Sequence, residues 1–284
     1  MGGPRTADRA GPPAVTQPRE ATADVTADVT ADVRAAYDAT GAAWDGGPRR
    51  IYDQLAAVLL DGCPVSFDRA IALDAGAGTG AATAELMRRG ARVTAIDLSV
   101  GMLRRITGAA AVGDVVRLPV RTGAVDIAVA AFVLNHLPRP VDGLRELARV
   151  TRPSGAVLVS VFGQALAHPS KDAIDAVAAG YGFAIPAWYS RMKDTFELQA
   201  TTPEALNALA HQSGLVDAEA RLVTIAPTMT DRDVVSWRLG MAHLAPFVAS
   251  LPPAQAKALA DDACVAVTGM PQLEIAMVTL AGRP

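Results

Sequence analysis

Between residues 71 and 162 the chain alternates short apolar runs with amphipathic segments. The apolar runs have the lengths and the Gly, Asp and Pro boundaries of buried strands, and the segments between them have helical spacing. Strands are therefore predicted at 71–74, 92–97, 109–114, 125–132 and 156–162. Helices are predicted at 80–89, from Ser99 to about Gly108, and at 141–150, with a turn over "TRPSG" at 151–155.

This order of elements is typical of a parallel sheet that is covered by helices on both faces, so an α/β, Rossmann-like doubly wound fold is predicted. The pattern changes after residue 162. A helical insert that carries an aromatic cluster is expected over 163–215. Within and beyond it we expect a helix at 203–213, a strand at 219–226, helices at 230–248 and 252–263, and a last strand at 272–280.

The N-terminal segment has a different composition from the rest of the chain. Residues 1–32 are rich in Pro, Gly, Thr, Ala and Asp and end in three copies of TADV, so a mobile tail is predicted there. Residues 33–60 are interpreted as two helices broken at "GGP" (46–48). Residues 33–284 are expected to form one domain, since 51% hydrophobic residues are ample for a core.

Charge and cysteine content exclude several classes of function. A net charge of −3 without a long basic run makes nucleic acid a poor partner. Cys63 and Cys264 lack metal or redox spacing, and no metal site is expected. No apolar run has the length of a membrane span, which needs about 20 residues. These features favour a cytoplasmic protein that acts on a small molecule.

A glycine-rich turn follows the first predicted strand. In "LDAGAGTG", Asp74 ends the strand, and Gly76, Gly78 and Gly80 come before the next helix. Glycines let the backbone approach a ligand closely, and the helix start presents unpaired N–H groups to it. The G-x-G-x-G spacing lacks the third glycine of the dinucleotide pattern at its usual place. The turn alone leaves the ligand open, and an ordinary tight turn is the alternative.

Carboxylates end three successive strands, at Asp74, Asp97 and Asp114. Ligands of such sheets bind at the carboxyl ends of the strands, where these side chains should converge. Asp97 is placed to accept the hydroxyls of a ribose, and Asp114 is placed to hold an adenine amino group. Asp74 would repel a pyrophosphate and would favour a cationic ligand.

Together these motifs resemble those of the class I S-adenosylmethionine-dependent methyltransferases, in the branch of the ubiquinone and menaquinone enzymes. "LDAGAGTG", "VTAIDLSVGML", "GDVVRLPV", "VDIAVAAFVLNHLPRP" and "LRELARVTRPSGAVLVSVF" occur in order, and the match covers about residues 35–162. The resemblance implies a seven-stranded sheet whose last strand is antiparallel, S-adenosylmethionine as cofactor, and helical lid segments at 33–60.

The resemblance also assigns individual positions to the cofactor. Gly76, Ala77 and Gly78 would line its methionine part, and Asp97 would take the ribose hydroxyls. The adenine would lie among Leu98, Met102, Asp114 and Val115, with Ala131 and Phe132 as the floor of the site. Tyr37 and Trp44 match aromatic positions of the helix that closes over the cofactor.

His136 is the candidate catalytic residue. It follows the fourth strand, where many relatives carry two histidines and this chain has Asn135-His136. It is interpreted either as a general base, if the acceptor must lose a proton, or as a hydrogen-bonded wall residue. His168, His211 and His243 have no supporting context and are expected on the surface or in ordinary helix positions.

The acceptor is defined by elimination. The chain has no Asn/Asp-Pro-Pro-aromatic motif and no cysteine after the fourth strand, so amino groups of bases or glutamine and cytosine carbon are disfavoured. A small organic acceptor remains, methylated at oxygen or carbon, with natural-product biosynthesis as one interpretation. The aromatic cluster of the insert is either a wall of its pocket or ordinary helix packing. It consists of Tyr181, Phe183, Trp188, Tyr189 and Phe196.

Two other functions are weighed against methyl transfer. One is an NAD-dependent oxidoreductase, which the glycine spacing and Asp114 disfavour. The other is a methyltransferase-like protein that binds the cofactor without transferring its methyl group. The absence of demethylated product with any acceptor would identify that second case.

Overall fold

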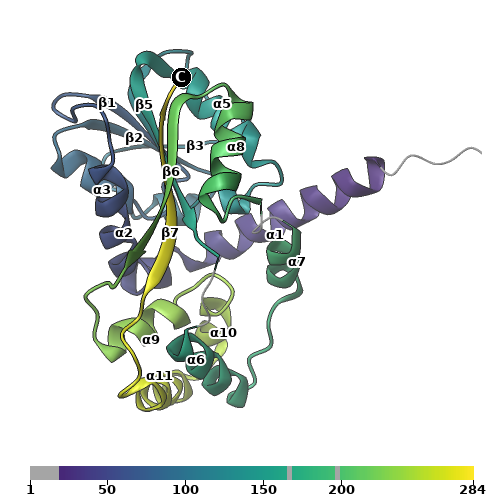
Figure 1. Ribbon diagram of the computed structural model, residues 1–284. Coiled ribbons are helices and arrows are strands. Elements are labelled where there is room, and N and C mark those ends of the chain that lie inside the picture. The colour runs from purple at the N-terminus through teal and green to yellow at the C-terminus, as the bar shows by residue number, and fades with distance from the viewer. Residues whose placement is uncertain (1–18, 165–167, 196–198) are drawn as a thin grey trace, which may run out of the picture.

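The computed structural model describes residues 19–164, 168–195 and 199–284 (Figure 1). Among these residues, seven strands form one sheet in the order β3-β2-β1-β4-β5-β7-β6. The strands are β1 (Ile71–Ala75), β2 (Arg92–Asp97), β3 (Ala109–Val112), β4 (Val125–Ala131), β5 (Thr151–Phe162), β6 (Val216–Ile225) and β7 (Ile275–Arg283).

The direction of the strands confirms the predicted fold. β1, β2, β3, β4 and β5 pair in parallel, and β7 pairs antiparallel with both β5 and β6. The strand order reverses beside β1, which lies between β2 and β4. A crevice at the carboxyl ends of these strands is where ligands bind in such sheets. The doubly wound sheet with an antiparallel last strand is therefore present.

Helices cover both faces of the sheet because both faces of its strands are apolar. Ala72 and Ile127 face α2 (Arg49–Asp61) and α3 (Ala81–Arg88). Leu73 and Ala128, one position along, face α5 (Pro140–Val150) and α8 (Pro203–Ser213). Alternate residues of one strand thus enter different cores, as the period of two requires. The predicted helices at 80–89, 141–150 and 203–213 are found close to their expected bounds.

The segment "TRPSG" is not a turn. It begins β5, because Thr151 pairs with Val125 and Ala156 pairs with Ile127, so the strand bulges between these pairs. A Cβ at Gly155 would lie 2.4 Å from the carbonyl oxygen of Asp126, so glycine permits the close approach of the two strands at the bulge. The prediction of a turn over 151–155 was wrong, since Gly and Pro also mark a bulge at the start of a strand.

A separate helical lobe lies at the end of the sheet. It comprises α6 (Pro169–Gly180), α9 (Asp231–Leu239), α10 (Ala245–Ser250) and α11 (Pro253–Val267) (Figure 1). The single helix expected at 230–248 is therefore two, and the interval between them begins at Gly240. The expected insert at 163–215 also divides differently, because α8 covers the sheet while the lobe takes most of its helices from beyond β6. The helix expected after Ser99 is shorter than predicted, since α4 spans Val100–Leu103.

The first helix starts well before the position expected from the sequence. α1 spans Arg19–Gly46, so the predicted boundary between tail and domain falls inside a helix. The four-residue period of the TADV repeat explains this, since it places valines on one helical face. Val29 and Val33 are buried against Met192 of α7 (Ala187–Thr195). The prediction of a mobile tail is wrong for this part of the chain.

A glycine contact holds α1 against the sheet domain. A Cβ at Gly41 would lie 2.3 Å from the carbonyl oxygen of Gly101 in α4, so the two backbones approach closely. Asp38 accepts hydrogen bonds from Ser99 Oγ at 2.8 Å and from the Gly101 N–H at 3.1 Å. These bonds lower the pKa of the Asp38 carboxyl against the opposing effect of partial burial. Figure 1 shows α1 passing between the sheet and the helical lobe, with α7 beside it.

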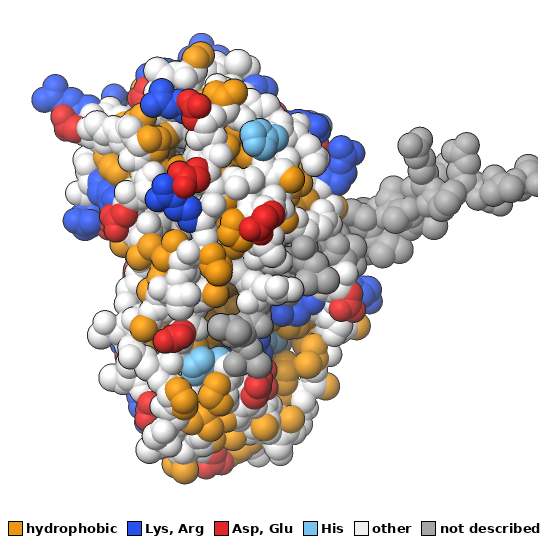
Figure 2. All heavy atoms as spheres, in the orientation of Figure 1, with side chains coloured by type: hydrophobic (Ala, Val, Ile, Leu, Met, Phe, Trp, Pro, Cys, Tyr) orange, Lys and Arg blue, Asp and Glu red, His pale blue; other side chains and the backbone are white. Residues whose placement is uncertain are grey.

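On the visible face, side chains of both charges are interspersed over the sheet end, while hydrophobic side chains are frequent over the lobe (Figure 2). In the described ranges, no helix combines the length and apolar character that crossing a membrane requires.

Candidate cofactor and acceptor site

A cavity of about 290 Å³ opens at the carboxyl ends of β1, β2 and β4. Every residue that the sequence proposed for the cofactor lines it, and so does His136. These residues are Tyr37, Trp44, Asp74, Gly76, Ala77, Gly78, Asp97, Leu98, Met102, Asp114, Val115, Ala131 and Phe132. The fold therefore brings positions separated by almost a hundred residues to one place.

The glycine turn forms the base of this cavity. Gly76, Gly78 and Gly80 have φ values of +73°, +54° and +90°, which favour glycine. A Cβ at Gly76 would lie 2.3 Å from the side chain of Val133, whereas a Cβ at Gly78 would meet nothing within 4 Å. The Gly78 backbone is thus open on the side where a side chain would stand, as close approach by a ligand requires.

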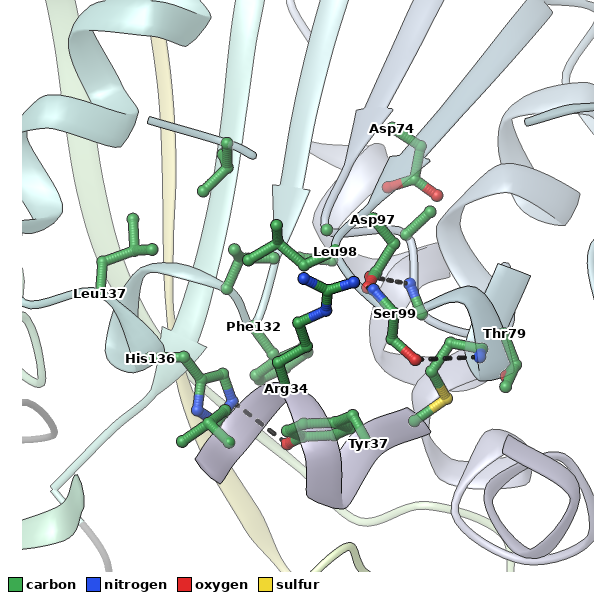
Figure 3. Close-up of a pocket in the computed structure, with 18 of the residues that line it drawn as sticks. Arg34, Tyr37, Asp74, Thr79, Asp97, Leu98, Ser99, Phe132, His136 and Leu137 are labelled. Carbon is green, nitrogen blue, oxygen red and sulfur yellow. Dashed lines mark hydrogen bonds between the residues drawn. The ribbon is translucent and has the colours of Figure 1, made fainter. Parts of the chain in front are cut away.

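Asp97 is fixed by the backbone around it (Figure 3). Its Oδ2 accepts the N–H of Gly78 at 2.8 Å, and its Oδ1 accepts the N–H of Ser99 at 2.8 Å. Burial raises the pKa of the carboxyl, and the two N–H donors oppose that rise. Each oxygen keeps a second lone pair, so the carboxylate is oriented yet still able to accept two hydroxyl groups.

Asp74 lies deeper, with 1% of its surface exposed. Thr83 Oγ1 donates to its Oδ2 at 2.6 Å, and its Oδ1 has no hydrogen-bond partner among the described residues. Burial raises the pKa of this carboxyl to about 6, and the charge of Asp97 adds to the effect. A cationic group in the cavity would offset the cost of this buried charge.

Tyr37 and His136 meet at one end of the cavity (Figure 3). The Tyr37 hydroxyl lies 3.3 Å from His136 Nε2, and Asn135 Nδ2 lies 3.5 Å from the same atom. His136 Nδ1 lies 3.3 Å from the sulfur of Met192. Burial raises the pKa of Tyr37 well above its ordinary value, so its hydroxyl stays protonated and can donate. These neighbours favour the tautomer with the proton on Nδ1 and the lone pair on Nε2.

Aromatic rings continue from Tyr37 along the lining of the cavity. Trp44 lies 5.4 Å from Tyr37 and 5.1 Å from Tyr52, between ring centroids. Tyr52 then contacts Phe132 edge-on at 5.2 Å, and Phe132 lies 4.5 Å from Phe162. Phe132 has a φ of +59°, a left-handed conformation that bulky side chains rarely adopt and that marks a functional position in many proteins.

Several lining residues were not among those proposed from the sequence. Tyr52 of α2 lines the cavity, although no sequence motif pointed to it. Thr30, Val33 and Arg34 of α1 also line it, and Figure 3 shows the Arg34 side chain extending toward Leu98. The apolar period of the TADV repeat was the signal that could have placed this part of α1 over the site.

A second cavity of about 590 Å³ adjoins the first. Tyr37, Tyr52 and His136 line both cavities, so these side chains stand at the junction. The second cavity continues between α7, α9 and the loop before β7. The rest of its aromatic lining is contributed by Phe162, Trp188, Tyr189 and Trp237.

The aromatic cluster of the predicted insert does not act as one wall. Trp188 and Tyr189 line the second cavity. Tyr181 instead donates to Asp262 at 2.6 Å on the outside of the lobe, and Phe183 packs on Phe247 with centroids 5.4 Å apart. Phe196 lies outside the described residues. Some members of the cluster therefore form a wall of the second cavity, and others make ordinary packing contacts.

His243 was expected in an ordinary position, and this expectation was wrong. It is 3% exposed and stacks on the Tyr189 ring with centroids 3.9 Å apart and planes 10° apart. Burial lowers its pKa to about 2, with further lowering by Arg238, Lys193 and Lys171. A neutral His243 therefore lines the second cavity. His211 lies in the exposed last turn of α8 as expected, while His168 caps α6 and lines the second cavity.

Sequence comparison agrees with the fold. The family described as "Methyltransferase domain" matches residues 73–159. The demethylmenaquinone methyltransferase of Mycolicibacterium vanbaalenii is 36% identical over 149 residues, which is 50% of this chain and 63% of that protein. The chain thus spans less than two thirds of the curated relatives it matches first.

Two solved structures share the fold at low sequence identity. A protein described as a methyltransferase from an antibiotic biosynthesis pathway in Anabaena variabilis has a TM-score of 0.57 at 14% identity, over 81% of this chain and 97% of its own. Phosphoethanolamine N-methyltransferase 2 of Haemonchus contortus, in complex with S-adenosylhomocysteine, has a TM-score of 0.52 at 14% identity, over 81% of this chain and 52% of its own.

Residues 73–159 match a methyltransferase domain, and the sheet around them has the strand order that the class I S-adenosylmethionine-dependent methyltransferase resemblance implied. The chain therefore contains a methyltransferase domain with this fold.

Proposed function

We propose that this protein transfers a methyl group from S-adenosylmethionine to an oxygen or carbon of a small organic acceptor. The observation that carries the proposal is the junction of two cavities at Tyr37, Tyr52 and His136. One cavity is lined by the motif residues of the family, and the other is large enough for a small acceptor. The reacting groups would meet where the two cavities join.

The residues of the first cavity fit S-adenosylmethionine. The partnerless oxygen of Asp74 suits a ligand with a cationic group, and the open face of Gly78 permits close approach. Asp97 is oriented to accept ribose hydroxyls, and Leu98, Met102 and Asp114 would surround the adenine. When bound, the cofactor supplies a methyl group made electrophilic by a sulfonium. The solved complex of the Haemonchus contortus enzyme with S-adenosylhomocysteine supports this assignment.

The residues at the junction exclude water and handle the acceptor's proton. Tyr37, Trp44 and Tyr52 form an aromatic cover. Because the cofactor provides a good leaving group, methyl transfer depends more on alignment of the reacting groups and exclusion of water than on acid catalysis. His136 Nε2 carries the lone pair that would take a proton from an acceptor hydroxyl. Tyr37 and Met192 hold the imidazole in that tautomer.

Three observations support a place in natural-product metabolism inside the cell. The second cavity is lined mainly by residues outside the matched domain, as expected where acceptors vary between relatives. The structural neighbour from an antibiotic biosynthesis pathway is consistent with such a role. Cys63 and Cys264 are unpaired and far apart in sequence, which suits the reducing cytoplasm.

Calorimetry and a turnover assay test the proposal together. We expect S-adenosylhomocysteine to bind and NAD to show no measurable binding. We also expect S-adenosylhomocysteine to be released from S-adenosylmethionine in the presence of small aromatic acceptors that carry hydroxyl groups. Binding of NAD instead would favour the oxidoreductase, and cofactor binding without release on any acceptor would favour a protein that does not transfer methyl.

A further inference from the structure

Arg49 joins the start of α2 to the glycine turn of the cofactor cavity. Its Nη1 donates to the Thr79 carbonyl oxygen at 2.6 Å, and its Nη2 donates to the Gly80 carbonyl oxygen at 3.4 Å. The same guanidinium donates from Nη1 to Asp45 of α1 at 3.3 Å and from Nε to Asp53 of α2 at 3.2 Å. One planar group therefore connects the end of α1, the start of α2 and the turn that lines the cavity.

The Thr79 carbonyl accepts from Arg49 in place of a bond from the following helix. In a regular helix this carbonyl would accept the N–H of Thr83, four residues further on. That N–H instead donates to the Asp74 carboxylate, where it opposes the rise in pKa that burial causes. Thr79 is 2% exposed, so water has little access to it. A buried carbonyl is costly to leave without a donor, and Arg49 supplies the donor here.

The two halves of the glycine turn are held from different sides. Gly76 and Ala77 donate to the Ile96 carbonyl oxygen at 2.7 and 3.0 Å, so β2 holds the first half. The second half is held at Thr79 by Arg49. The three glycines of the turn have positive φ values, and glycine leaves any one conformation more easily than other residues do. Without Arg49 the second half would be free to move.

We propose that Arg49 is a positioning residue for the cofactor. It holds the glycine turn in the conformation that receives the methionine part of S-adenosylmethionine, and it joins that turn to the docked position of α1. This inference rests on the proposed function, because it assigns the turn to that cofactor. Arg49 lies outside the matched domain at 73–159 and outside the described lining of both cavities, so neither the family nor the cavities point to it.

Calorimetric titrations of the full chain with two ligands test the proposal. S-adenosylhomocysteine carries the amino-acid part that the turn would receive, whereas 5′-methylthioadenosine keeps the adenine, the ribose and the sulfur without it. Arg49→Met retains an apolar side chain and removes every donor. We expect it to weaken S-adenosylhomocysteine binding at least about 10-fold and to change methylthioadenosine binding by less than about 2-fold. Arg49→Lys keeps the charge and one donor group, so its loss should be smaller.

Amide hydrogen exchange of the unliganded protein gives a second measurement that needs no ligand. The Gly78 N–H donates to Asp97 Oδ2 at 2.8 Å, and the Gly80 N–H donates to the Ala77 carbonyl oxygen at 2.9 Å. In Arg49→Met these amides should exchange at least about 10-fold faster, because the turn opens more often, while the amides of β5 stay unchanged.

Arg50→Met is the matched control. Arg50 is the next residue of α2, and it forms its ion pair with Asp233 of α9 rather than with the turn. This variant should bind both ligands as the wild type does and should leave exchange in the turn unchanged. Equal losses of affinity for the two ligands in Arg49→Met, or no loss for S-adenosylhomocysteine, would overturn the inference. So would turn amides that exchange equally fast in the two variants.

The wild-type titration separates this inference from the proposed function. If the wild type binds S-adenosylhomocysteine and Arg49→Met binds it equally well, the proposed function stands and Arg49 is not a positioning residue. If the wild type does not bind S-adenosylhomocysteine, the proposed function is wrong, and the role of Arg49 toward that cofactor is wrong with it. Faster exchange in Arg49→Met would then show only that Arg49 holds the turn.

Discussion

The Tyr37 hydroxyl and His136 Nε2 lie 3.3 Å apart, and this contact joins the first helix to the turn after β4. Both side chains line both cavities. Tyr37 comes from the cover of the site and His136 from the end of the sheet. Closing the cover therefore also sets the tautomer of the candidate base, so exclusion of water and proton acceptance would depend on the same contact.

We expect His136→Gln to lower turnover by about 10²-fold or more, with little change in cofactor affinity, because a general base is lost. Tyr37→Phe is the matched variant, since it keeps the ring and removes the hydroxyl. It should give a smaller loss of turnover, because His136 Nε2 would still be able to accept a proton. Steady-state rates and calorimetry with S-adenosylhomocysteine separate the two effects. An unchanged rate for His136→Gln at neutral pH would make His136 a wall residue.

Replacing Asp97 should weaken the cofactor complex. Asp97→Ala removes two charge-assisted hydrogen bonds to the ribose, so the affinity for S-adenosylhomocysteine should fall by about 2–3 kcal/mol. Asp97→Asn keeps the shape of the side chain but not its charge, so its affinity for S-adenosylhomocysteine should lie between those of the wild type and Asp97→Ala. Asp68→Ala, on an exposed carboxylate away from the cavity, serves as the control. Unchanged affinity for Asp97→Ala in calorimetry would contradict the ribose assignment.

Asp74 should make the cofactor-free protein less stable as the pH rises. Burial raises its pKa from 3.8 to about 6, so the folded state holds this proton more tightly than the unfolded state does. The stabilisation is complete below the unfolded pKa and is lost as the pH passes the folded pKa, a change of about 3 kcal/mol. In Asp74→Asn this contribution is absent, while the amide oxygen can still accept from Thr83 Oγ1.

Denaturant unfolding of both proteins at pH 4 and pH 7.5 measures this effect. From pH 4 to pH 7.5 the unfolding free energy of the wild type should fall relative to that of Asp74→Asn. Comparing the two proteins at each pH cancels the contributions of the other carboxylates. A constant difference would show that Asp74 has an ordinary pKa. Cofactor binding at pH 6 should also release protons, because a cationic ligand lowers the pKa of Asp74.

The parallel sheet and the carboxylates at the ends of its strands could be predicted from the sequence, because the signals for them are local. Strand period, the glycine turn and the carboxylates at the strand ends each lie within one βα unit. The reversal of strand order beside β1 then brings Asp74 and Asp97 together without any further choice. The carboxylates of the candidate cofactor site thus follow from the order of elements, whereas positions such as Leu98, Met102 and Phe132 were assigned by the family resemblance.

The second cavity could not be derived in this way. Trp188 and Arg238 reach it from different helices, separated by β6, and no periodic pattern links those helices. His243 lies in the interval between α9 and α10, so its burial depends on how the lobe packs.

The glycine contact between α1 and α4 should be needed for cofactor binding. In Gly101→Ala the new Cβ would lie 2.0 Å from the carbonyl oxygen of Asp38, so α1 must move away. Overpacking of this kind costs about 1–3 kcal/mol, and we expect cofactor affinity and unfolding free energy to fall together. Gly46→Ala is the matched control, since a Cβ there meets nothing within 4 Å. Equal affinities for the two variants would show that α1 can shift without affecting the site.

Three N-terminal truncations test the role of α1, starting at residues 19, 31 and 51. Removing residues 1–18 should leave binding and activity unchanged, because that segment has few apolar residues to bury. The mobile tail predicted from the sequence over residues 1–32 would imply the same for a start at residue 31. The structure changes that expectation, since Val29 is 1% exposed and packs with Val33 against Met192 of α7.

The start at residue 31 should therefore weaken acceptor binding more than cofactor binding, because α7 forms a wall of the second cavity while Asp97 and the glycine turn are untouched. The start at residue 51 also removes Tyr37 and Trp44, so cofactor affinity and turnover should fall together as water reaches the site. Calorimetry with S-adenosylhomocysteine and the Michaelis constant for the acceptor distinguish the three proteins. If the shortest protein still binds cofactor and turns over normally, α1 is no cover and the sheet alone builds the site.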